Sequence, residues 1–246
     1  MTKVEYGEIM VKNYKTLLFD IDNTLLDFSA SEKIALKRLF EGQNFPLTPE
    51  VKACYQTINR GLWTAFEEGK IDRDEVMNTR FSILFKEYGL EVDGVSLEKN
   101  YHSYLKEGHQ LINGALELIK ELQNQFDLYI VTNGDSETQY KRLHDSGLYP
   151  LFKDIFVSED TGYRKPMKEY FDYVFERIPN LSLENTLIIG DSLSADIKGG
   201  QMAGIDTCWF NPKMIPNDTG ILPTYEIQKL EELYRVLNLE KAAVGC

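Results

Sequence analysis

The sequence has few cysteines, and this shortage excludes two classes of protein. Its three cysteines, Cys54, Cys208 and Cys246, lie far apart in a chain of 246 residues and form no CxxC pair. That spacing argues against a zinc site and against a disulfide framework. Reduced thiols fit the cytoplasm, so we expect a cytoplasmic protein.

Positive charge is also scarce. Lys and Arg total 27 against 39 Asp and Glu, which gives a net charge of −12. Such a charge repels nucleic-acid polymers and anionic membrane surfaces, so we expect neither as a partner. A phosphate group bound by this chain must be neutralised locally.

Long apolar runs are absent. None approaches the roughly 18 residues of a membrane-spanning helix, and the N-terminal stretch MTKVEYGEIMVKNY has no apolar signal segment. Met10 offers an alternative start, which would leave residues 1–9 as an extension. With 43% hydrophobic and 27% charged residues, the composition is that of an ordinary globular protein.

Short apolar, β-branched runs predict five buried strands. They lie at residues 16–20, 128–132, 154–158, 186–191 and 207–210. Stretches with helical periodicity lie at residues 115–124, 137–146, 168–178 and 195–203. Because strand and helix alternate, we expect an α/β fold with a doubly wound parallel sheet covered on both faces.

The segment 27–110 differs because it contains no strand-like run. It predicts four helices, near residues 30–41, 49–67, 73–88 and 96–107. Thr48 and Asp72 stand where helix N-caps belong. We therefore expect a helical domain of residues 27–110, inserted into an α/β core domain of residues 1–26 and 111–246. Its ends emerge near the first strand, so we expect it to stand over the carboxyl edge of the sheet.

Polar side chains end three of the predicted strands. They are Asp20 with Asp22, then Thr132, then Asp191. The carboxyl ends of parallel strands line one crevice, so these groups should converge. Carboxylates repel one another when brought together, and a site made only of oxygen ligands favours Mg²⁺. The sequence therefore predicts a magnesium site at this edge.

Four motifs in order resemble those of the haloacid dehalogenase superfamily of phosphohydrolases. They are DIDNTLLDF (20–28), VTNG (131–134), YRKP (163–166) and GDSLSAD (190–196). The similarity runs from about Tyr14 to Leu237, and the helical insertion resembles the helical cap of that superfamily. The resemblance implies a Rossmann-like core with a cap, and a Mg²⁺-dependent phosphomonoesterase that works through an aspartyl-phosphate.

The resemblance also implies roles for individual acids. Asp20 would be the nucleophile, and Asp22 would protonate the leaving group and then deprotonate water. Asp20, the backbone carbonyl of Asp22, and Asp191 would hold Mg²⁺. An acid at position 22 favours phosphoryl transfer over dehalogenation, because dehalogenase members lack it.

Three further residues would bind the phosphoryl group. They are Thr132, Asn133 and Lys165, of which Thr132 and Lys165 also count as catalytic. Asp196 supports this site by ordering a metal-bound water or by holding Lys165, unless it is only an acid at a helix N-terminus. For Lys165 the alternative is a solvated surface lysine.

The segment SEDTGYRKPMKEYFDYVFE (158–176), with TINRGLW (57–63) and EGHQLINGA (107–115), resembles a narrower subgroup, the bacterial pyrimidine 5′-nucleotidases. This implies that the substrate is a small phosphorylated molecule from the class of pyrimidine nucleoside monophosphates, which includes non-canonical nucleotides. In the insertion, Trp63 could stack on a base and Arg80 could bind an oxyanion. Core packing of Trp63 and a surface salt bridge of Arg80 are the alternatives. We expect a monomer or a weak homodimer.

Two other functions share parts of this pattern. A phosphatase or mutase for a small sugar or organic phosphate has the same four motifs and differs only in its cap. A signalling module phosphorylated on Asp also gathers acids, a Thr and a Lys at strand ends. Such a module places its phospho-acceptor on a later strand than its acidic pair and has about half this length, whereas here Asp20 and Asp22 share one loop.

Overall fold

The computed structural model describes residues 12–67 and 69–239. Cys246 and the predicted extension of residues 1–9 lie outside the described residues. The chain divides into two compact units, which we describe separately. The core unit comprises the chain up to Asp27 and from Leu111 onward, and the helical unit comprises Phe28–Gln110.

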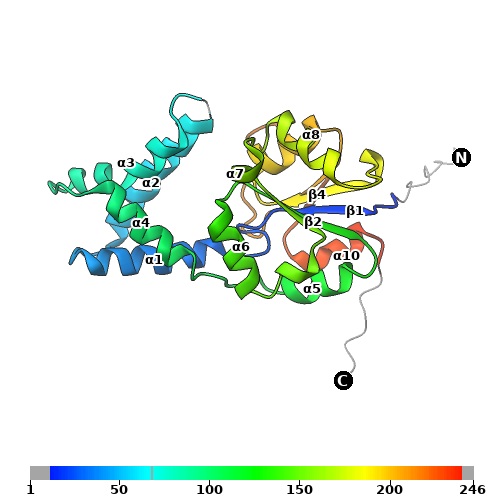
Figure 1. Ribbon diagram of the computed structural model, residues 1–246, viewed down its shortest axis with the longest axis horizontal. Coiled ribbons are helices and arrows are strands. Elements are labelled where there is room, and N and C mark those ends of the chain that lie inside the picture. Colours follow the sequence, from blue (N-terminus) through cyan, green and yellow to red (C-terminus); the bar gives the residue numbers. More distant parts are fainter. Residues whose placement is uncertain (1–11, 68, 240–246) are drawn as a thin grey trace, which may run out of the picture. The chain divides into compact units, whose positions relative to one another are not determined.

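A parallel sheet forms the centre of the core unit (Figure 1). Its strands are β1 (Thr16–Phe19), β2 (Asp127–Thr132), β3 (Asp154–Val157), β4 (Thr186–Gly190), β5 (Asp206–Phe210) and β6 (Tyr225–Ile227). Their order is β3-β2-β1-β4-β5-β6, and every neighbouring pair is parallel. The predicted doubly wound parallel sheet is confirmed, and β6 was not predicted.

The strand order reverses its direction between β1 and β4. From β1 the chain adds β2 and β3 on one side, and then β4, β5 and β6 on the other. Ligands of open α/β sheets bind at such a switch point, outside the carboxyl ends of the strands. The residues that follow β1 and β4 are therefore the first place to look for a site.

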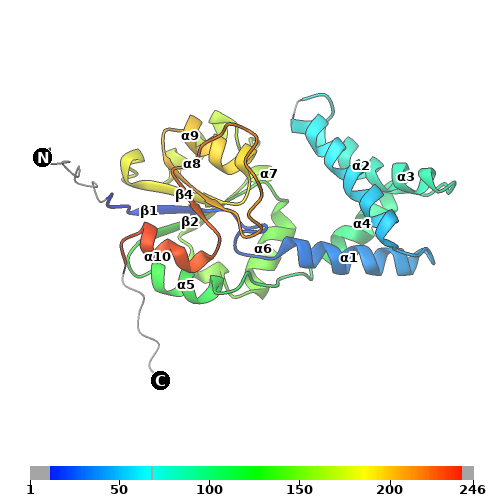
Figure 2. The same ribbon diagram turned by 180° about the vertical axis from the view of Figure 1, so that it is seen from behind.

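Helices cover both faces of this sheet, with α5 and α10 on one face and α8 and α9 on the other (Figure 2). The helices of the core unit are α5 (Ala115–Leu122), α6 (Ser136–Asp145), α7 (Ser158–Thr161), α8 (Lys168–Arg177), α9 (Lys198–Met202) and α10 (Leu233–Val236). Successive residues of a strand point to opposite faces. In β1, Leu17 and Phe19 accordingly join the apolar cluster with α5, whereas Leu18 joins the cluster with α8.

The helical unit consists of α1 (Phe28–Gly42), α2 (Pro49–Glu67), α3 (Arg73–Glu87) and α4 (Gly94–Leu105). Thr48 Oγ1 accepts a hydrogen bond from Val51 N at 3.3 Å, and Asp72 Oδ1 accepts one from Glu75 N at 2.8 Å. Both caps predicted from the sequence are therefore present. Four helices occur where the apolar periodicity predicts them, with ends shifted by a few residues.

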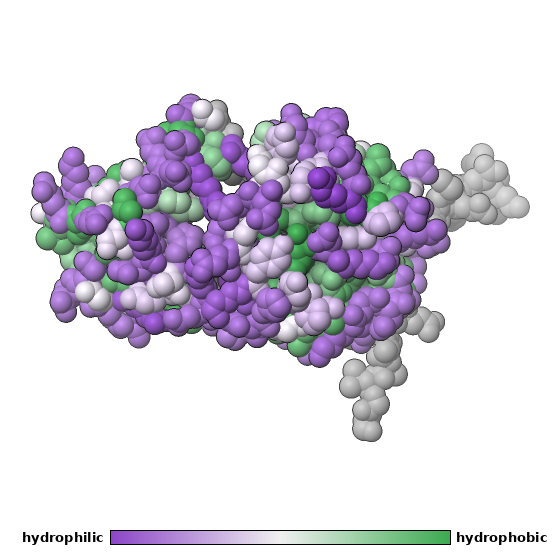
Figure 3. Space-filling view, viewed as in Figure 1, coloured by the Kyte–Doolittle hydropathy of each residue, from purple (hydrophilic) through white to green (hydrophobic). Residues whose placement is uncertain are grey.

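The helical unit has an apolar core of its own, which includes Phe40, Tyr55, Phe81, Phe85 and Tyr101. Hydrophilic residues cover most of the visible face of each unit (Figure 3). Within the described part of the chain, no helix combines the length and apolarity that crossing a bilayer requires.

Candidate active site

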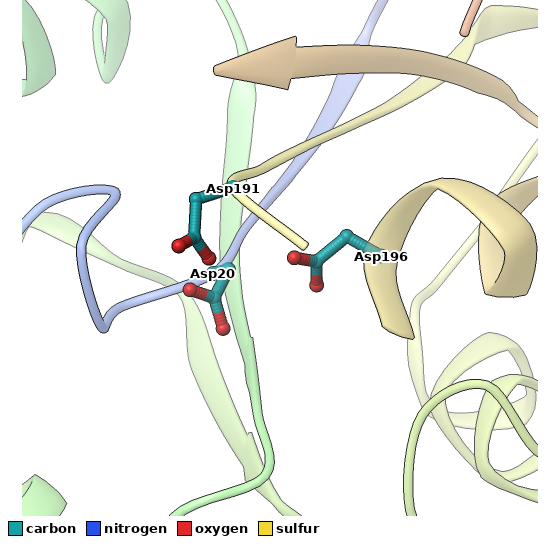
Figure 4. Close-up of side chains that lie close together, drawn as sticks. All are labelled: Asp20, Asp191 and Asp196. Atoms are coloured by element: carbon teal, nitrogen blue, oxygen red, sulfur yellow. The ribbon is translucent and has the colours of Figure 1, made fainter. Parts of the chain in front are cut away.

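Three acids form a compact cluster at the carboxyl ends of β1 and β4. Asp20 directly follows β1, Asp191 directly follows β4, and Asp196 lies in the π-helical turn Leu193–Ile197. One carboxylate oxygen from each lies within 4.8 Å of those from the other two. The side chains of Asp20 and Asp191 lie next to each other, and the carboxylate of Asp196 points toward them (Figure 4).

Lys165 joins two of these acids. Its Nζ lies 2.7 Å from Asp20 Oδ1 and 2.6 Å from Asp196 Oδ1, and it donates to Val131 O at 2.7 Å. Only 3% of Lys165 is exposed. The alternative of a solvated surface lysine is therefore wrong, and Asp196 holds Lys165, which was one of its two supporting roles.

Burial and mutual repulsion set the charges of this cluster. Burial, together with the neighbouring carboxylates, raises the pKa of Asp20 and of Asp191, and Lys165 offsets only part of that effect. For Lys165, burial acts to lower the pKa, but Asp196 and Asp20 raise it above the usual lysine range. Lys165 thus carries a fixed positive charge. This single charge does not balance the negative charges that Asp20, Asp191 and Asp196 would carry together.

The donor set of this cluster fits a hard divalent cation. The three acids offer only carboxylate oxygens as ligand atoms, which Mg²⁺ prefers over nitrogen and sulfur ligands. Burial is the main cause of the raised pKa values of Asp20 and Asp191, and repulsion from nearby carboxylates adds to it; a cation between the two groups would offset that repulsion.

Asp22 lies beside the cluster, and donors from helix α6 bond both of its carboxylate oxygens. Arg142 Nη1 donates to Asp22 Oδ1 at 2.6 Å, and Gln139 Nε2 donates to Asp22 Oδ2 at 2.7 Å. Gln139 Nε2 also donates to Thr132 Oγ1 at 2.9 Å. Sequence analysis missed Gln139 and Arg142. Their spacing, which places both on one face of a helix, was the signal available.

Thr132 and Asn133 follow one another at the end of β2. Thr132 is buried, and its Oγ1 also accepts from Gly134 N at 3.2 Å. The side chain of Asn133 exchanges two hydrogen bonds with the backbone of Lys165: its Nδ2 donates to Lys165 O, and its Oδ1 accepts from Lys165 N, both at 2.9 Å. The Asn133 side chain therefore holds the Lys165 segment in place.

A tryptophan of β5 supports the metal-ligand candidate Asp191. Trp209 Nε1 donates to the backbone oxygen of Asp191 at 2.8 Å, and Trp209 is almost fully buried. Sequence analysis used Trp209 only as part of a strand. The hydrogen bond from its indole N–H joins β5 to the residue that follows β4. The apolar pattern of one strand gives no information about contacts with another strand, so this bond could not be predicted.

The two residues predicted to bind substrate in the helical unit have different surroundings. Arg80 is 4% exposed and forms a buried ion pair with Glu98, with Nε to Oε2 at 2.8 Å, while its Nη1 donates to Asn59 Oδ1 at 3.1 Å. The prediction that Arg80 binds an oxyanion and the alternative that it forms a surface salt bridge are both wrong, because the guanidinium is buried and already paired with Glu98. Trp63 is half-buried, with its ring edge-to-face to that of Phe66, and its role stays a prediction.

Comparison with known proteins identifies a family. The model of the haloacid dehalogenase-like hydrolases matches residues 14–204. YfnB of Bacillus subtilis (strain 168) is 70% identical over 236 residues, which cover 96% of this chain and 100% of YfnB. The orthorhombic crystal structure of YfnB, bound to magnesium, superposes with a TM-score of 0.90, at 71% identity over 93% of this chain and 100% of that one. It reveals an interdomain movement in YfnB.

Two further relatives are named pyrimidine 5′-nucleotidases. PynA of Streptococcus pneumoniae is 42% identical over 226 residues, covering 92% of this chain and 95% of PynA. YjjG of Escherichia coli (strain K12) is 32% identical over 221 residues, covering 90% of this chain and 96% of YjjG. The superfamily resemblance predicted from the four motifs is confirmed. The chain belongs to the haloacid dehalogenase-like hydrolases, and it is a phosphatase of that family.

Proposed function

We propose that this phosphatase hydrolyses pyrimidine nucleoside 5′-monophosphates. The observation that carries the chemistry is the buried Lys165 ammonium, 2.7 Å from Asp20 and 2.6 Å from Asp196, beside the acid cluster at the switch point of the sheet. The substrate class is supported by two relatives with that name, at 42% and 32% identity.

In the first step, Asp20 attacks phosphorus, and the bond from phosphorus to the ester oxygen breaks. Asp22 gives its proton to the leaving 5′-oxygen, so a neutral nucleoside departs and an aspartyl-phosphate remains. In the second step, water attacks phosphorus and gives a proton to Asp22. The bond to Asp20 breaks, inorganic phosphate leaves, and both acids return to their starting states.

The phosphoryl group needs positive charge and hydrogen-bond donors. Lys165 supplies a charge that burial beside Asp20 and Asp196 keeps in one place. We assign further donors to the Thr132 hydroxyl and to the backbone N–H of Asn133. The side chain of Asn133 contributes indirectly, by holding the Lys165 segment.

Asp20, Asp191 and the backbone carbonyl of Asp22 would hold Mg²⁺. The compact carboxylate cluster supports this assignment, and the similar protein YfnB binds magnesium. When bound, the ion supplies positive charge that offsets repulsion between phosphate and carboxylates.

We propose that the helical unit acts as a cap that selects the substrate. The core residues recognise only the phosphoryl group, which all phosphomonoesters share, so selectivity must come from contacts to the leaving group. Trp63, half-buried on α2, offers an aromatic surface for a pyrimidine ring.

The free thiols of Cys54 and Cys208 support a cytoplasmic location of the protein.

The test is a hydrolysis assay on pyrimidine and purine nucleotides and on sugar phosphates, with Mg²⁺ or a chelator. We expect the pyrimidine nucleotides to be preferred and turnover to require Mg²⁺. Faster hydrolysis of sugar phosphates would overturn the substrate assignment, and full activity after chelation would overturn the metal assignment.

A substitution at the nucleophile tests the chemistry. Asp20→Asn is nearly isosteric and cannot form the acyl phosphate, so turnover should vanish while thermal melting shows an intact fold. Asp127→Asn, an exposed partner of Lys153, is the matched control and should keep wild-type activity. If Asp20→Asn retains more than about a tenth of wild-type kcat, a loss below about 1.4 kcal/mol, Asp20 is not the nucleophile.

A further inference from the structure

Two side chains on one face of helix α6 bond both oxygens of the Asp22 carboxylate. Arg142 Nη1 lies 2.6 Å from Oδ1, and Gln139 Nε2 lies 2.7 Å from Oδ2. The two donors are also bonded to each other, since Arg142 Nη1 donates to Gln139 Oε1 at 3.0 Å. Helix α6 and the loop after β1, more than a hundred residues apart in the chain, are thus joined by a closed set of hydrogen bonds.

The burial of this network is unusual for its residue types. Arg142 is 2% exposed and Gln139 is 1% exposed, whereas 30% of the Asp22 side chain is exposed. A buried arginine is costly unless it is paired and hydrogen-bonded. Arg142 reaches through the interior and pairs with Asp22, the carboxylate that remains partly open to solvent.

Gln139 connects Asp22 with Thr132. Its Nε2 carries two hydrogens and lies within hydrogen-bond distance of Asp22 Oδ2 and of Thr132 Oγ1, at 2.7 and 2.9 Å. Gln139 occupies space that a side chain at position 134 would fill, since a Cβ at Gly134 would lie 2.5 Å from Gln139 Cγ. The absence of a side chain at Gly134 thus lets the Gln139 amide lie where it bonds both Asp22 and Thr132.

We propose that Arg142 and Gln139 are positioning residues that hold the Asp22 carboxyl group in the orientation needed for proton transfer. The proposal rests on the proposed function, in which Asp22 is the acid and base. Each carboxyl oxygen has two lone-pair positions. The α6 donors occupy one on each oxygen, which fixes the plane of the group and leaves the other positions for the transferable proton. Without them, Asp22 rotates freely, and proton transfer loses its alignment.

Positioning of an acid predicts a dependence on the leaving group that a purely structural role does not. A nucleoside 5′-oxygen leaves poorly unless it is protonated, whereas 4-nitrophenolate leaves without a proton. Loss of a positioned acid should therefore lower kcat/KM for hydrolysis of uridine 5′-monophosphate about 100-fold. For 4-nitrophenyl phosphate, kcat/KM should fall less than about fivefold. The ratio kcat/KM is the proper measure because it reports steps up to the first irreversible one.

The variants are Arg142→Met, which removes the charge and the donor, Arg142→Lys, which keeps the charge, and Gln139→Met. Asp22→Asn provides the reference pattern for loss of the acid. Lys141→Ala, on the same helix and paired at the surface with Asp145, is the matched control and should leave both substrates unaffected. Thermal melting of each variant reports its folding.

We expect Arg142→Met and Gln139→Met to show the same selective loss that we expect for Asp22→Asn, and Arg142→Lys to show an intermediate loss. In the Asp22→Asn background, Arg142→Met should cause no further loss, because both changes remove one function. An equal loss on the two substrates, or a full additional loss in the double variant, would overturn the proposal. If Arg142→Met does not fold, Arg142→Lys and Gln139→Met decide by the same criterion.

Failure of this proposal is distinguishable from failure of the proposed function. If Asp22→Asn shows the selective loss and the α6 variants do not, only the positioning role is wrong. If the wild-type enzyme cleaves neither ester, or if Asp22→Asn slows both equally, the proposed roles of the core residues are wrong, and the positioning role is overturned with them.

Discussion

The carboxylate of Asp196 lies in the space that a side chain at Gly190 would fill. A Cβ built at position 190 would be 2.2 Å from Asp196 Cγ, far inside van der Waals contact. Gly190 is the last residue of β4, and Asp196 lies in the turn that follows. The absence of a side chain at Gly190 thus lets Asp196 come within 2.6 Å of Lys165 Nζ.

Substitution Gly190→Ala should therefore damage the site. The added methyl group must displace Asp196, which releases Lys165 from one of its two ion pairs, and overpacking of this kind costs about 1–3 kcal/mol. We expect kcat to fall more than about tenfold, the equivalent of 1.4 kcal/mol, together with a lower free energy of unfolding. Steady-state kinetics and urea denaturation measure the two effects.

Gly61→Ala is the control for this substitution. A Cβ at Gly61 would meet nothing within 4 Å, and the residue lies within α2. Gly61→Ala should raise the free energy of unfolding by about 0.5–1 kcal/mol, because glycine is less favourable than alanine within a helix. Wild-type activity in Gly190→Ala would show that Asp196 does not need its present position.

The sequence predicts the parts of the site that depend on strand patterns. Each of Asp20 and Asp191 directly follows a short apolar run that predicts a buried strand, and the structure has a strand at both places. Since parallel strands end at one edge, their convergence follows from topology alone. Lys165 and Asp196 needed the family resemblance, because nothing in a loop sequence indicates that a lysine is buried.

The residues that sequence analysis missed are buried polar groups with distant partners. Helix α6, SETQYKRLHD, has a polar sequence and appears solvent-facing from its composition. Arg142 is nevertheless buried, because it pairs with Asp22, which lies 120 residues earlier in the chain. Arg80 was misjudged for the same reason, since its partner Glu98 belongs to another helix. Helical periodicity reports apolar faces and gives no sign of such pairs.

Binding of Mg²⁺ should change the fluorescence of Trp209. Its indole N–H donates to the backbone oxygen of Asp191 at 2.8 Å, so a cation held by Asp191 alters its surroundings. The sequence contains two tryptophans, and Trp63→Phe leaves Trp209 as the only one. In that variant we expect a saturable change on titration with Mg²⁺ without substrate.

Asp191→Asn in the Trp63→Phe background is the control for this titration. It removes one proposed ligand and should shift the midpoint to higher Mg²⁺ by about tenfold or more, if the lost contact is worth about 1.4 kcal/mol. An identical titration curve in both proteins would place the cation away from Asp191.

Trp63 should contribute selectively to nucleotide binding. A base stacked on an aromatic ring is worth about 1–3 kcal/mol. Trp63→Ala should therefore raise KM for a pyrimidine nucleotide about tenfold or more relative to a small aryl phosphate, and Trp63→Phe should restore part of the difference. An equal change for both substrates would show that Trp63 only packs within the helical unit.

The stability of the helical unit should depend on pH through the buried pair of Glu98 and Arg80. Burial acts to raise the pKa of Glu98, but hydrogen bonds from His102 and Arg80 hold it below the usual carboxyl range. A carboxyl group with a lowered folded-state pKa stabilises the fold fully above its unfolded-state pKa. That stabilisation is lost as the pH falls through the lower, folded-state pKa.

Glu98→Gln tests this expectation. It leaves the buried Arg80 without its counter-charge and should cost about 3–5 kcal/mol near neutral pH. The difference in stability from the wild type, measured by urea unfolding, should narrow only as the pH falls below the usual carboxyl range and through the lowered pKa of Glu98, where Glu98 itself becomes neutral. Glu41→Gln, which removes an exposed pair with Lys37 at 3.7 Å, should cost less than about 1 kcal/mol. A gap between wild type and Glu98→Gln that stays constant down to acid pH would show that Glu98 is not ionised in the folded protein.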